Sequence, residues 1–179
     1  MTTELPCLID EERLQRRVAE LAAEINEAYA GTEMLVLVGV LKGSFMFLSD
    51  LAKRLTIPHR VEFIAVSSYG TRESQEHTGA VRLIMDVRHD IGGADVLVIE
   101  DIVDTGHTIA YLKELLSARH PKTLGLCTLL HKPDRTEAEV TIDFLGFTIP
   151  DVWVVGFGLD YAERHRTLPY VAELPEELR

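Results

Sequence analysis

The chain has 179 residues, 46% of them apolar and 26% charged, which suits one globular domain with a sizeable core. Its 29 acids outnumber its 18 bases and give a net charge of −11, which excludes broad nucleic-acid binding, since that needs a basic face. No apolar stretch is long enough to span a bilayer and no secretory signal is visible, so we expect a cytoplasmic protein without nucleic-acid or membrane partners.

The first part of the chain alternates helical and strand patterns. Asp10 suits the N-cap of a helix whose apolar residues recur at helical spacing until Gly31. A continuous apolar strand is predicted at residues 34–40, and a second helix follows it. Two further strands, at residues 61–66 and 81–85, are separated by a long polar loop, and such loops in compact domains are usually functional lids or disordered.

The stretch at residues 95–108, DVLVIEDIVDTGHT, carries the strongest chemical pattern. Its short β-branched run ends in Glu100 and Asp101, which suits a strand buried on both faces. The Thr-Gly-His-Thr segment then places small residues and hydroxyls at a helix N-terminus, where free N–H groups and the helix dipole favour a phosphate. Acids beside an anion site suit a phosphorylated sugar.

The last part of the chain continues the alternation. A helix is expected from Ile109, a strand at residues 123–130 and a final strand at residues 152–157. This order predicts an α/β protein with a mostly parallel sheet covered on both faces. In such sheets ligands bind beyond the carboxyl ends of the strands. Four segments are predicted to meet there, namely Lys42-Gly43, residues 100–108, Lys132 and residues 158–160.

Several other phosphate and nucleotide sites are excluded by missing motifs. The chain has no Gly-Lys dipeptide and therefore no P-loop, and Gly156-Phe157-Gly158 lacks the third glycine of a dinucleotide fingerprint. No GxSxG elbow and no zinc-spaced Cys/His cluster is present.

The remaining pattern resembles a known family. Residues 98–108 resemble the phosphoribosyl pyrophosphate (PRPP) motif of type I phosphoribosyltransferases. Further segments in matching order resemble the hypoxanthine-guanine phosphoribosyltransferases: Leu41-Lys42-Gly43, Ser67-Ser68-Tyr69-Gly70, Leu130-His131-Lys132-Pro133, and Trp153-Val154-Val155-Gly156 with Gly158-Leu159-Asp160-Tyr161. The resemblance implies one domain over residues 1–179 with the type I phosphoribosyltransferase fold. A mostly parallel core at about residues 34–157 would carry a small hood from the N-terminal segment and residues 158–179.

The resemblance also implies an activity. The protein would be a pentosyltransferase of purine salvage that moves the 5-phosphoribosyl group from PRPP to hypoxanthine or guanine, giving IMP or GMP and pyrophosphate. Asp104 would act as general acid/base, although an Asp there also suits a helix N-cap. Mg²⁺ would be the cofactor, contacted by Glu100, Asp101 and Asp160.

Each remaining site residue receives a role from the same resemblance. PRPP would be bound by Glu100, Asp101, Thr105, Gly106, His107 through its N–H, Thr108, Lys42, Gly43 and Arg166, with Arg164 the competitor for the last place. The purine would be bound by Lys132, Trp153 and Val154, although Phe or Tyr is commoner than Trp there. Lys132 would favour 6-oxopurines, because an adenine 6-amino group cannot accept its hydrogen bond. Ser68 and Tyr69 would lie on the lid.

Two alternatives stay open at this point. One is a phosphoribosyltransferase for another base, such as xanthine, and the other is a non-catalytic nucleotide-binding regulator of the same fold. The resemblance further implies a homodimer or a homotetramer.

Overall fold

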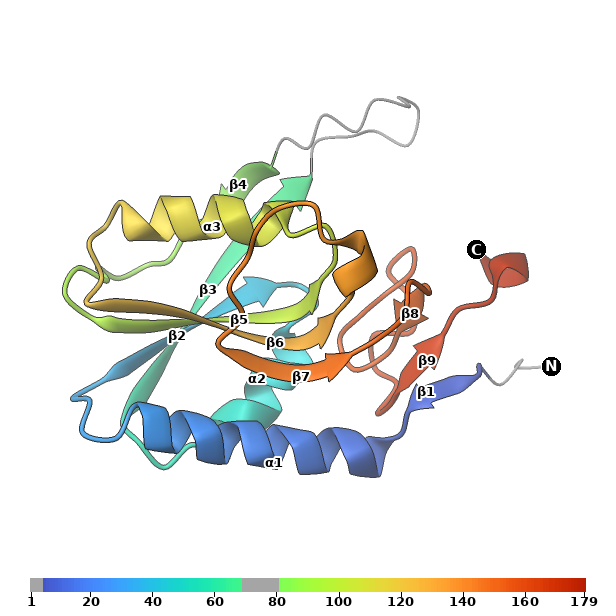
Figure 1. Cartoon of the computed structure of the whole chain (residues 1–179), viewed down its shortest axis with the longest axis horizontal. Coiled ribbons are helices and arrows are strands. Elements are labelled where there is room, and N and C mark those ends of the chain that lie inside the picture. The colour runs from blue at the N-terminus through green and yellow to red at the C-terminus, as the bar shows by residue number, and fades with distance from the viewer. Residues whose placement is uncertain (1–4, 69–80) are drawn as a thin grey trace.

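The computed structural model describes residues 5–68 and 81–179 (Figure 1). Within these residues the strands form a six-stranded sheet, in the order β4-β3-β2-β5-β6-β7, and a three-stranded sheet. The large sheet contains β2 (Leu35–Leu41), β3 (His59–Ser68), β4 (Val81–Met85), β5 (Asp95–Val103), β6 (Thr123–His131) and β7 (Phe144–Thr148). Its neighbouring strands pair in parallel, except for the antiparallel pair β3–β4. The predicted α/β class with a mostly parallel sheet is therefore confirmed.

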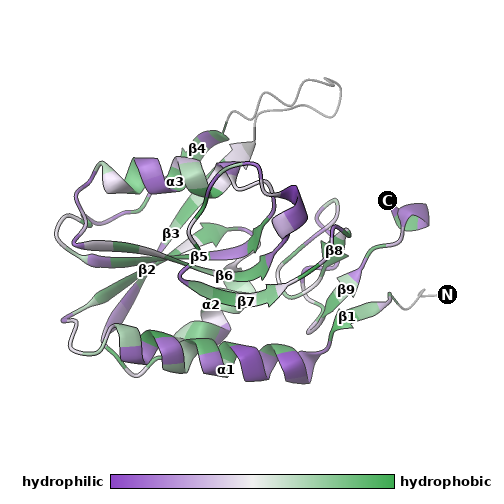
Figure 2. Cartoon of the chain, in the orientation of Figure 1, coloured by the Kyte–Doolittle hydropathy of each residue, from purple (hydrophilic) through white to green (hydrophobic). Residues whose placement is uncertain are grey.

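Helices cover both faces of the large sheet (Figure 1). Helices α1 (Glu11–Ala28) and α2 (Phe45–Ala52) pack on the face that Leu35 and Leu37 present, whereas α3 (His107–Ser117) packs with Val36 and Val38 on the other. Two buried faces explain why β2 is apolar without alternation. Figure 2 shows hydrophobic residues along the central strands and hydrophilic residues on the outer side of α1.

The three-stranded sheet forms the predicted hood from the chain ends. It consists of β1 (Cys7–Ile9), β9 (Val171–Glu173) and β8 (Val154–Val155), paired antiparallel. Two short 3₁₀ turns complete the described elements, η1 (Pro133–Arg135) and η2 (Glu176–Leu178).

Two sequence predictions differ from the structure near the end of the chain. The strand expected at residues 152–157 does not join the parallel sheet, because Val154 and Val155 pair with β9 in the hood. The sixth place in the large sheet belongs to β7, which the sequence analysis did not predict. Val154 and Val155 are both buried within the hood, so their apolar pattern is that of a core strand in either sheet. The predicted core boundary at residue 157 therefore includes a hood strand.

The predicted lid lies largely outside the described residues. Ser68 ends β3, whereas Tyr69 and the rest of the lid prediction fall in the segment that the structure does not describe. None of the helices in residues 5–68 and 81–179 is long and apolar enough to cross a membrane.

Candidate active site

The acidic pair lies at the carboxyl end of β5. Glu100 is only 5% exposed, and its Oε2 has no hydrogen-bond partner among the described residues. Burial, together with the neighbouring Asp101 charge, raises the pKa of the Glu100 carboxyl well above its usual range. Buried polar atoms are normally paired, so an unpaired carboxylate oxygen at a strand end indicates a place for a ligand.

The Lys42-Gly43 segment lies directly against this pair. A Cβ added to Gly43 would lie 1.6 Å from Asp101 Oδ2, and one added to Gly158 would lie 1.9 Å from the Gly43 carbonyl oxygen. Only glycine permits approaches this close. The Leu41–Lys42 peptide is cis. Three segments far apart in the chain therefore meet at one edge of the sheet.

The loop after β5 forms a cavity of about 240 Å³. It is lined by residues 100–106, 108 and 109, among them the predicted phosphate-binding residues Thr105, Gly106 and Thr108. Gly106 has φ +85° and precedes the first turn of α3, whose free N–H groups favour an anion. The His107 side chain turns to Glu137, with Nε2 2.9 Å from Oε2, which leaves its backbone N–H as the group at the helix start.

A second cluster lies beside this loop, at the end of β6. Lys132 is only 6% exposed, and its Nζ lies 3.8 Å from Asp151 Oδ1. Arg135 Nε lies 2.8 Å from Asp104 Oδ1 and its Nη1 lies 3.7 Å from Asp151 Oδ1. The Asp104–Arg135 contact is an ion pair by distance, but its angles do not give Asp104 Oδ1 a hydrogen bond. The structure thus places Asp104 and Lys132 on one side of the candidate site.

Arg135 and Asp151 are site residues that the sequence analysis missed. Arg135 lies one turn after Lys132, and this nearness in sequence to a predicted site residue was a weak indication of its place in the site. Asp151 follows β7, the strand that was not predicted, so no strand end marked its position.

The hood contributes an aromatic residue, Trp153, to the candidate site. Trp153 is 47% exposed and meets the Tyr161 ring edge-on, with ring centroids 5.6 Å apart. The Trp153 carbonyl accepts a hydrogen bond from the Leu174 N–H at 2.7 Å. The backbone of Val154 pairs with Glu173, which fixes this end of the hood.

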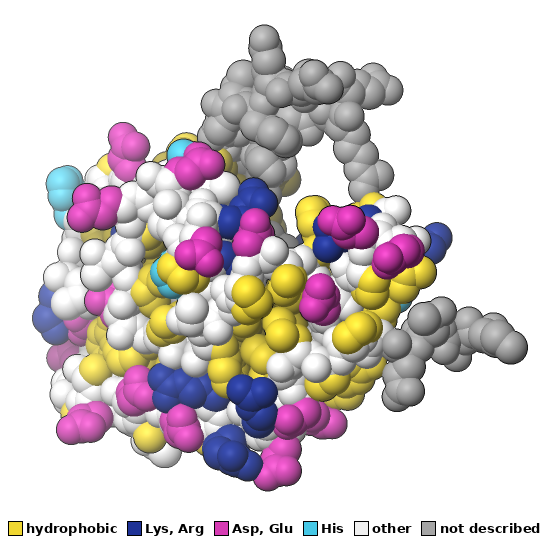
Figure 3. Space-filling view, turned by 45° about the vertical axis from the view of Figure 1, so that its right-hand side comes forward, with side chains coloured by type: hydrophobic (Ala, Val, Ile, Leu, Met, Phe, Trp, Pro, Cys, Tyr) yellow, Lys and Arg dark blue, Asp and Glu magenta, His cyan; other side chains and the backbone are white. Residues whose placement is uncertain are grey.

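Arg166 is fixed within the hood loop by contacts with Gly158, Asp160 and Glu163. Its Nη1 donates to the Gly158 carbonyl and its Nη2 lies 2.9 Å from Asp160 Oδ1. The other Asp160 oxygen accepts from the Glu163 N–H, so both oxygens of this predicted metal contact are engaged. The Lys42 ammonium pairs with Glu163 at 3.0 Å, which holds the pKa of that carboxyl below its usual range. Figure 3 shows acidic and basic side chains side by side above a hydrophobic band on this face.

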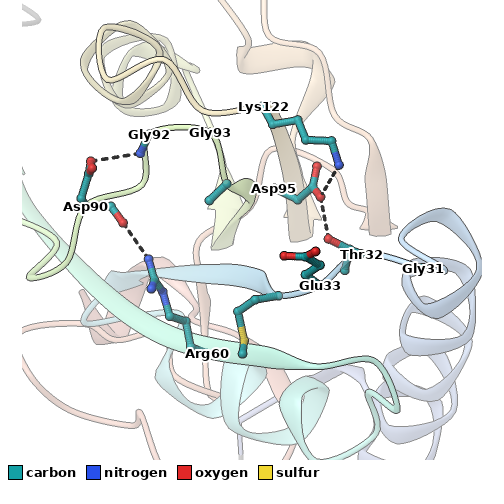
Figure 4. A pocket seen from close by; sticks show the side chains of 11 residues that line it. Gly31, Thr32, Glu33, Arg60, Asp90, Gly92, Gly93, Asp95 and Lys122 are labelled. Atoms are coloured by element: carbon teal, nitrogen blue, oxygen red, sulfur yellow. Dashed lines mark hydrogen bonds and ion pairs between the residues drawn. The ribbon is translucent and has the colours of Figure 1, made fainter.

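A larger cavity than the one after β5 lies elsewhere. About 610 Å³ in volume, it is lined by Thr32, Arg60, Asp95, Lys122 and their neighbours (Figure 4). These residues lie where strands begin, since β5 starts at Asp95 and β6 at Thr123. Ligands of parallel sheets bind at the opposite, carboxyl edge. We therefore place the chemistry at the smaller cavity, which has the unpaired Glu100 Oε2 and the phosphate loop.

Comparison with known proteins gives the family. The phosphoribosyl transferase domain matches residues 8–162. The chain belongs to this family. It is 48% identical over 169 residues to the hypoxanthine phosphoribosyltransferase of Salmonella typhimurium, covering 93% of each chain. It is 45% identical over 173 residues to the hypoxanthine-guanine phosphoribosyltransferase of Dictyostelium discoideum, covering 95% of each.

A solved structure supports the same assignment to the phosphoribosyl transferase family. The hypoxanthine phosphoribosyltransferase of Staphylococcus aureus superposes with a TM-score of 0.91 at 43% identity, covering 99% of this chain and 97% of that one. The resemblance drawn from the sequence is therefore confirmed. The roles of individual residues stay predictions, and the structure supplies their positions.

Proposed function

We propose that this phosphoribosyl transferase moves the 5-phosphoribosyl group from PRPP to hypoxanthine or guanine in cytoplasmic purine salvage, giving IMP or GMP and pyrophosphate. The observation that carries the proposal is the buried Glu100 carboxylate, whose Oε2 has no hydrogen-bond partner among the described residues, beside the phosphate loop after β5. The buried Lys132, one strand away, supplies a donor for a 6-oxopurine. The relatives with this activity in their names match almost the whole chain.

The residues divide the work between sugar and base. Thr105, Gly106 and Thr108 bind the 5′-phosphate through N–H groups and hydroxyls, and Glu100 and Asp101 bind the ribose hydroxyls. The Asp104 carboxylate accepts the proton from purine N7 as the glycosidic bond forms. Lys132 donates to O6 of the base, and the Trp153 ring stacks on it. The Lys42-Gly43 segment and Arg166 bind the departing pyrophosphate.

The acidic pair fits a magnesium ion shared with the substrate. Among the described residues, no group of three or more His, Cys, Asp or Glu side chains could hold a metal by itself. Mg²⁺ usually binds through one or two carboxylates and the oxygens of a phosphorylated substrate. Glu100 and Asp101 offer that number, and Mg²⁺ held there would neutralise charge on PRPP and pyrophosphate. Asp160 would have to leave Arg166 to contact a second ion.

A direct assay tests the function. The protein is incubated with PRPP and Mg²⁺ and with hypoxanthine, guanine, xanthine or adenine in turn, and nucleotide and pyrophosphate are measured. We expect product with hypoxanthine or guanine, none with adenine, and none when EDTA removes Mg²⁺. Nucleotide from xanthine alone would show a different base preference, and no product with any base would reject the proposal. We also propose that the protein forms a homodimer or a homotetramer, and a measurement of its molecular mass in solution tests this.

Substitution of Asp104 tests the proton-transfer step. Asp104→Asn keeps the size of the side chain but removes the proton acceptor, so we expect kcat to fall by roughly 10²–10⁴-fold. PRPP affinity, measured by calorimetry, should stay within about twofold, since Asp104 does not bind the phosphates in this scheme. A large loss of PRPP affinity with unchanged kcat would contradict the assignment.

A further inference from the structure

We propose that Arg135 and Asp151 are positioning residues that hold Asp104 and Lys132 as one unit. The inference rests on the proposed function, in which Asp104 takes the proton from purine N7 and Lys132 donates to O6. These two purine atoms lie on the same edge of the ring. The two side chains that meet them must therefore keep a fixed spacing, and catalysis is sensitive to errors of about 1 Å in such positions.

The side chains form a row of alternating charge. Asp104 meets Arg135 at 2.8 Å, Arg135 meets Asp151 at 3.7 Å, and Asp151 meets Lys132 at 3.8 Å. The buried Lys132 needs an opposite charge, because an unpaired buried cation is strongly unfavourable. Asp151 supplies it and is half-exposed, so it can contact both cations. Arg135 therefore links the general base Asp104 to the Asp151–Lys132 ion pair.

The backbone is tied together at the same place. Thr136 Oγ1 lies 3.2 Å from the Asp104 carbonyl oxygen and 3.0 Å from that of Lys132. The Lys132 N–H donates to the Val103 carbonyl at 3.0 Å. Turn η1 is therefore held against the loop after β5, and Arg135 on that turn faces Asp104 as a consequence. Without these backbone contacts, the long Arg135 side chain could turn away from Asp104.

The contact leaves Asp104 ready for a substrate. Arg135 lies against Oδ1, and that oxygen accepts no hydrogen bond from residues 5–68 and 81–179. Arg135 and Asp104 are 45% and 41% exposed at their side chains, and ion pairs this exposed contribute little to stability. A role in positioning therefore predicts a loss of turnover without a matching loss of stability.

The test uses three variants and a matched control. Arg135→Ala removes the bridge, Arg135→Lys keeps the charge, and Asp151→Asn removes the partner of Lys132. Arg119→Ala is the control, because Arg119 forms a half-exposed ion pair with Asp86 at 2.5 Å outside the candidate site. For each protein, kcat, KM for hypoxanthine, KM for PRPP and Tm are measured.

We expect Arg135→Ala to lower kcat by about 10–100-fold, with KM for PRPP within about twofold and Tm close to that of the control. Arg135→Lys should recover part of kcat. Asp151→Asn should mainly raise KM for hypoxanthine, by about 5–10-fold. Wild-type kcat in Arg135→Ala, no recovery in Arg135→Lys, or a loss that follows Tm would overturn the positioning role. A wild-type protein that makes no IMP would instead reject the proposed function.

Discussion

At the scale of single residues, the candidate site depends on two glycines that let distant segments touch. Gly43 brings its backbone against the Asp101 carboxylate, and Gly158 brings its own against the Gly43 carbonyl. Gly158 also has φ +103°, a conformation that other residues rarely adopt. The end of β5, the Lys42-Gly43 segment and the hood can therefore lie this close together because glycine has no side chain at the points of contact.

Gly43→Ala tests this close approach. A Cβ there would overlap Asp101 Oδ2, so the carboxylate must move, and we expect kcat/KM for PRPP to fall at least about 10-fold. Steady-state kinetics at saturating hypoxanthine measure the change. Gly92→Ala is the control, because its added Cβ would lie 3.4 Å from the nearest atoms, the Arg119 carbonyl oxygen and Asp90 Oδ1. Equal kinetics in both variants would show that the approach is not required.

At the scale of elements, α1 illustrates local determination. Asp10 accepts a hydrogen bond from the Arg13 N–H at 2.8 Å, as expected of an N-cap. The buried face of the helix consists of Leu14, Val18, Leu21, Ala22 and Ile25. Arg17 on the same helix donates to the carbonyls of Leu145 and Gly146 on β7. The helix thus also holds the edge strand that the sequence did not reveal.

Asp10→Ala removes the cap without touching the core. We expect the free energy of unfolding to fall by about 0.5–2 kcal/mol, measured by urea denaturation. Glu12→Ala is the matched control, since Glu12 is an exposed acid in the same first turn, paired with Arg16. A fall no larger than that of Glu12→Ala would mean that the cap contributes nothing.

At the scale of the whole molecule, the two ends of the parallel sheet have different tasks. The carboxyl ends carry the candidate chemistry, whereas the amino ends are tied by Asp95 (Figure 4). Its carboxylate accepts hydrogen bonds from Thr32, Lys122 and Thr123 at 2.5, 2.9 and 2.9 Å. These contacts, that from Thr32 foremost, lower the pKa of the Asp95 carboxyl. One buried acid therefore joins the loop after α1 to β5 and β6.

Asp95→Asn should lower stability in a pH-dependent way. A carboxyl whose pKa is lower in the folded protein adds stability above its unfolded pKa of about 3.9, and loses it as pH falls through the folded pKa. We expect a cost of roughly 1–3 kcal/mol at pH 7 that shrinks below about pH 4. Urea denaturation across pH measures it, with Asp90→Asn, on the rim of the same cavity, as control. A cost independent of pH would contradict the ionic explanation.

Features that depend on neighbours along the chain were predictable from the amino-acid sequence alone. The capped helix α1, the apolar parallel strands and the loop from Glu100 to Thr108 could be predicted, because cap, hydrophobic period and strand end are local patterns. The family followed from the order of such segments. The positions of Gly43 and Asp101 were predicted to converge for the same reason, since both follow predicted parallel strands.

The contacts between distant segments were visible only in the folded protein. Val154 and Val155 have the pattern of a core strand, yet they join the hood, because sheet membership depends on a partner strand and not on hydrophobicity. The contacts of Arg135 with Asp104 and of Lys42 with Glu163 join segments 31 and 121 residues apart. An ion pair needs a distance below about 4 Å, and that distance is set by the packing of the whole chain.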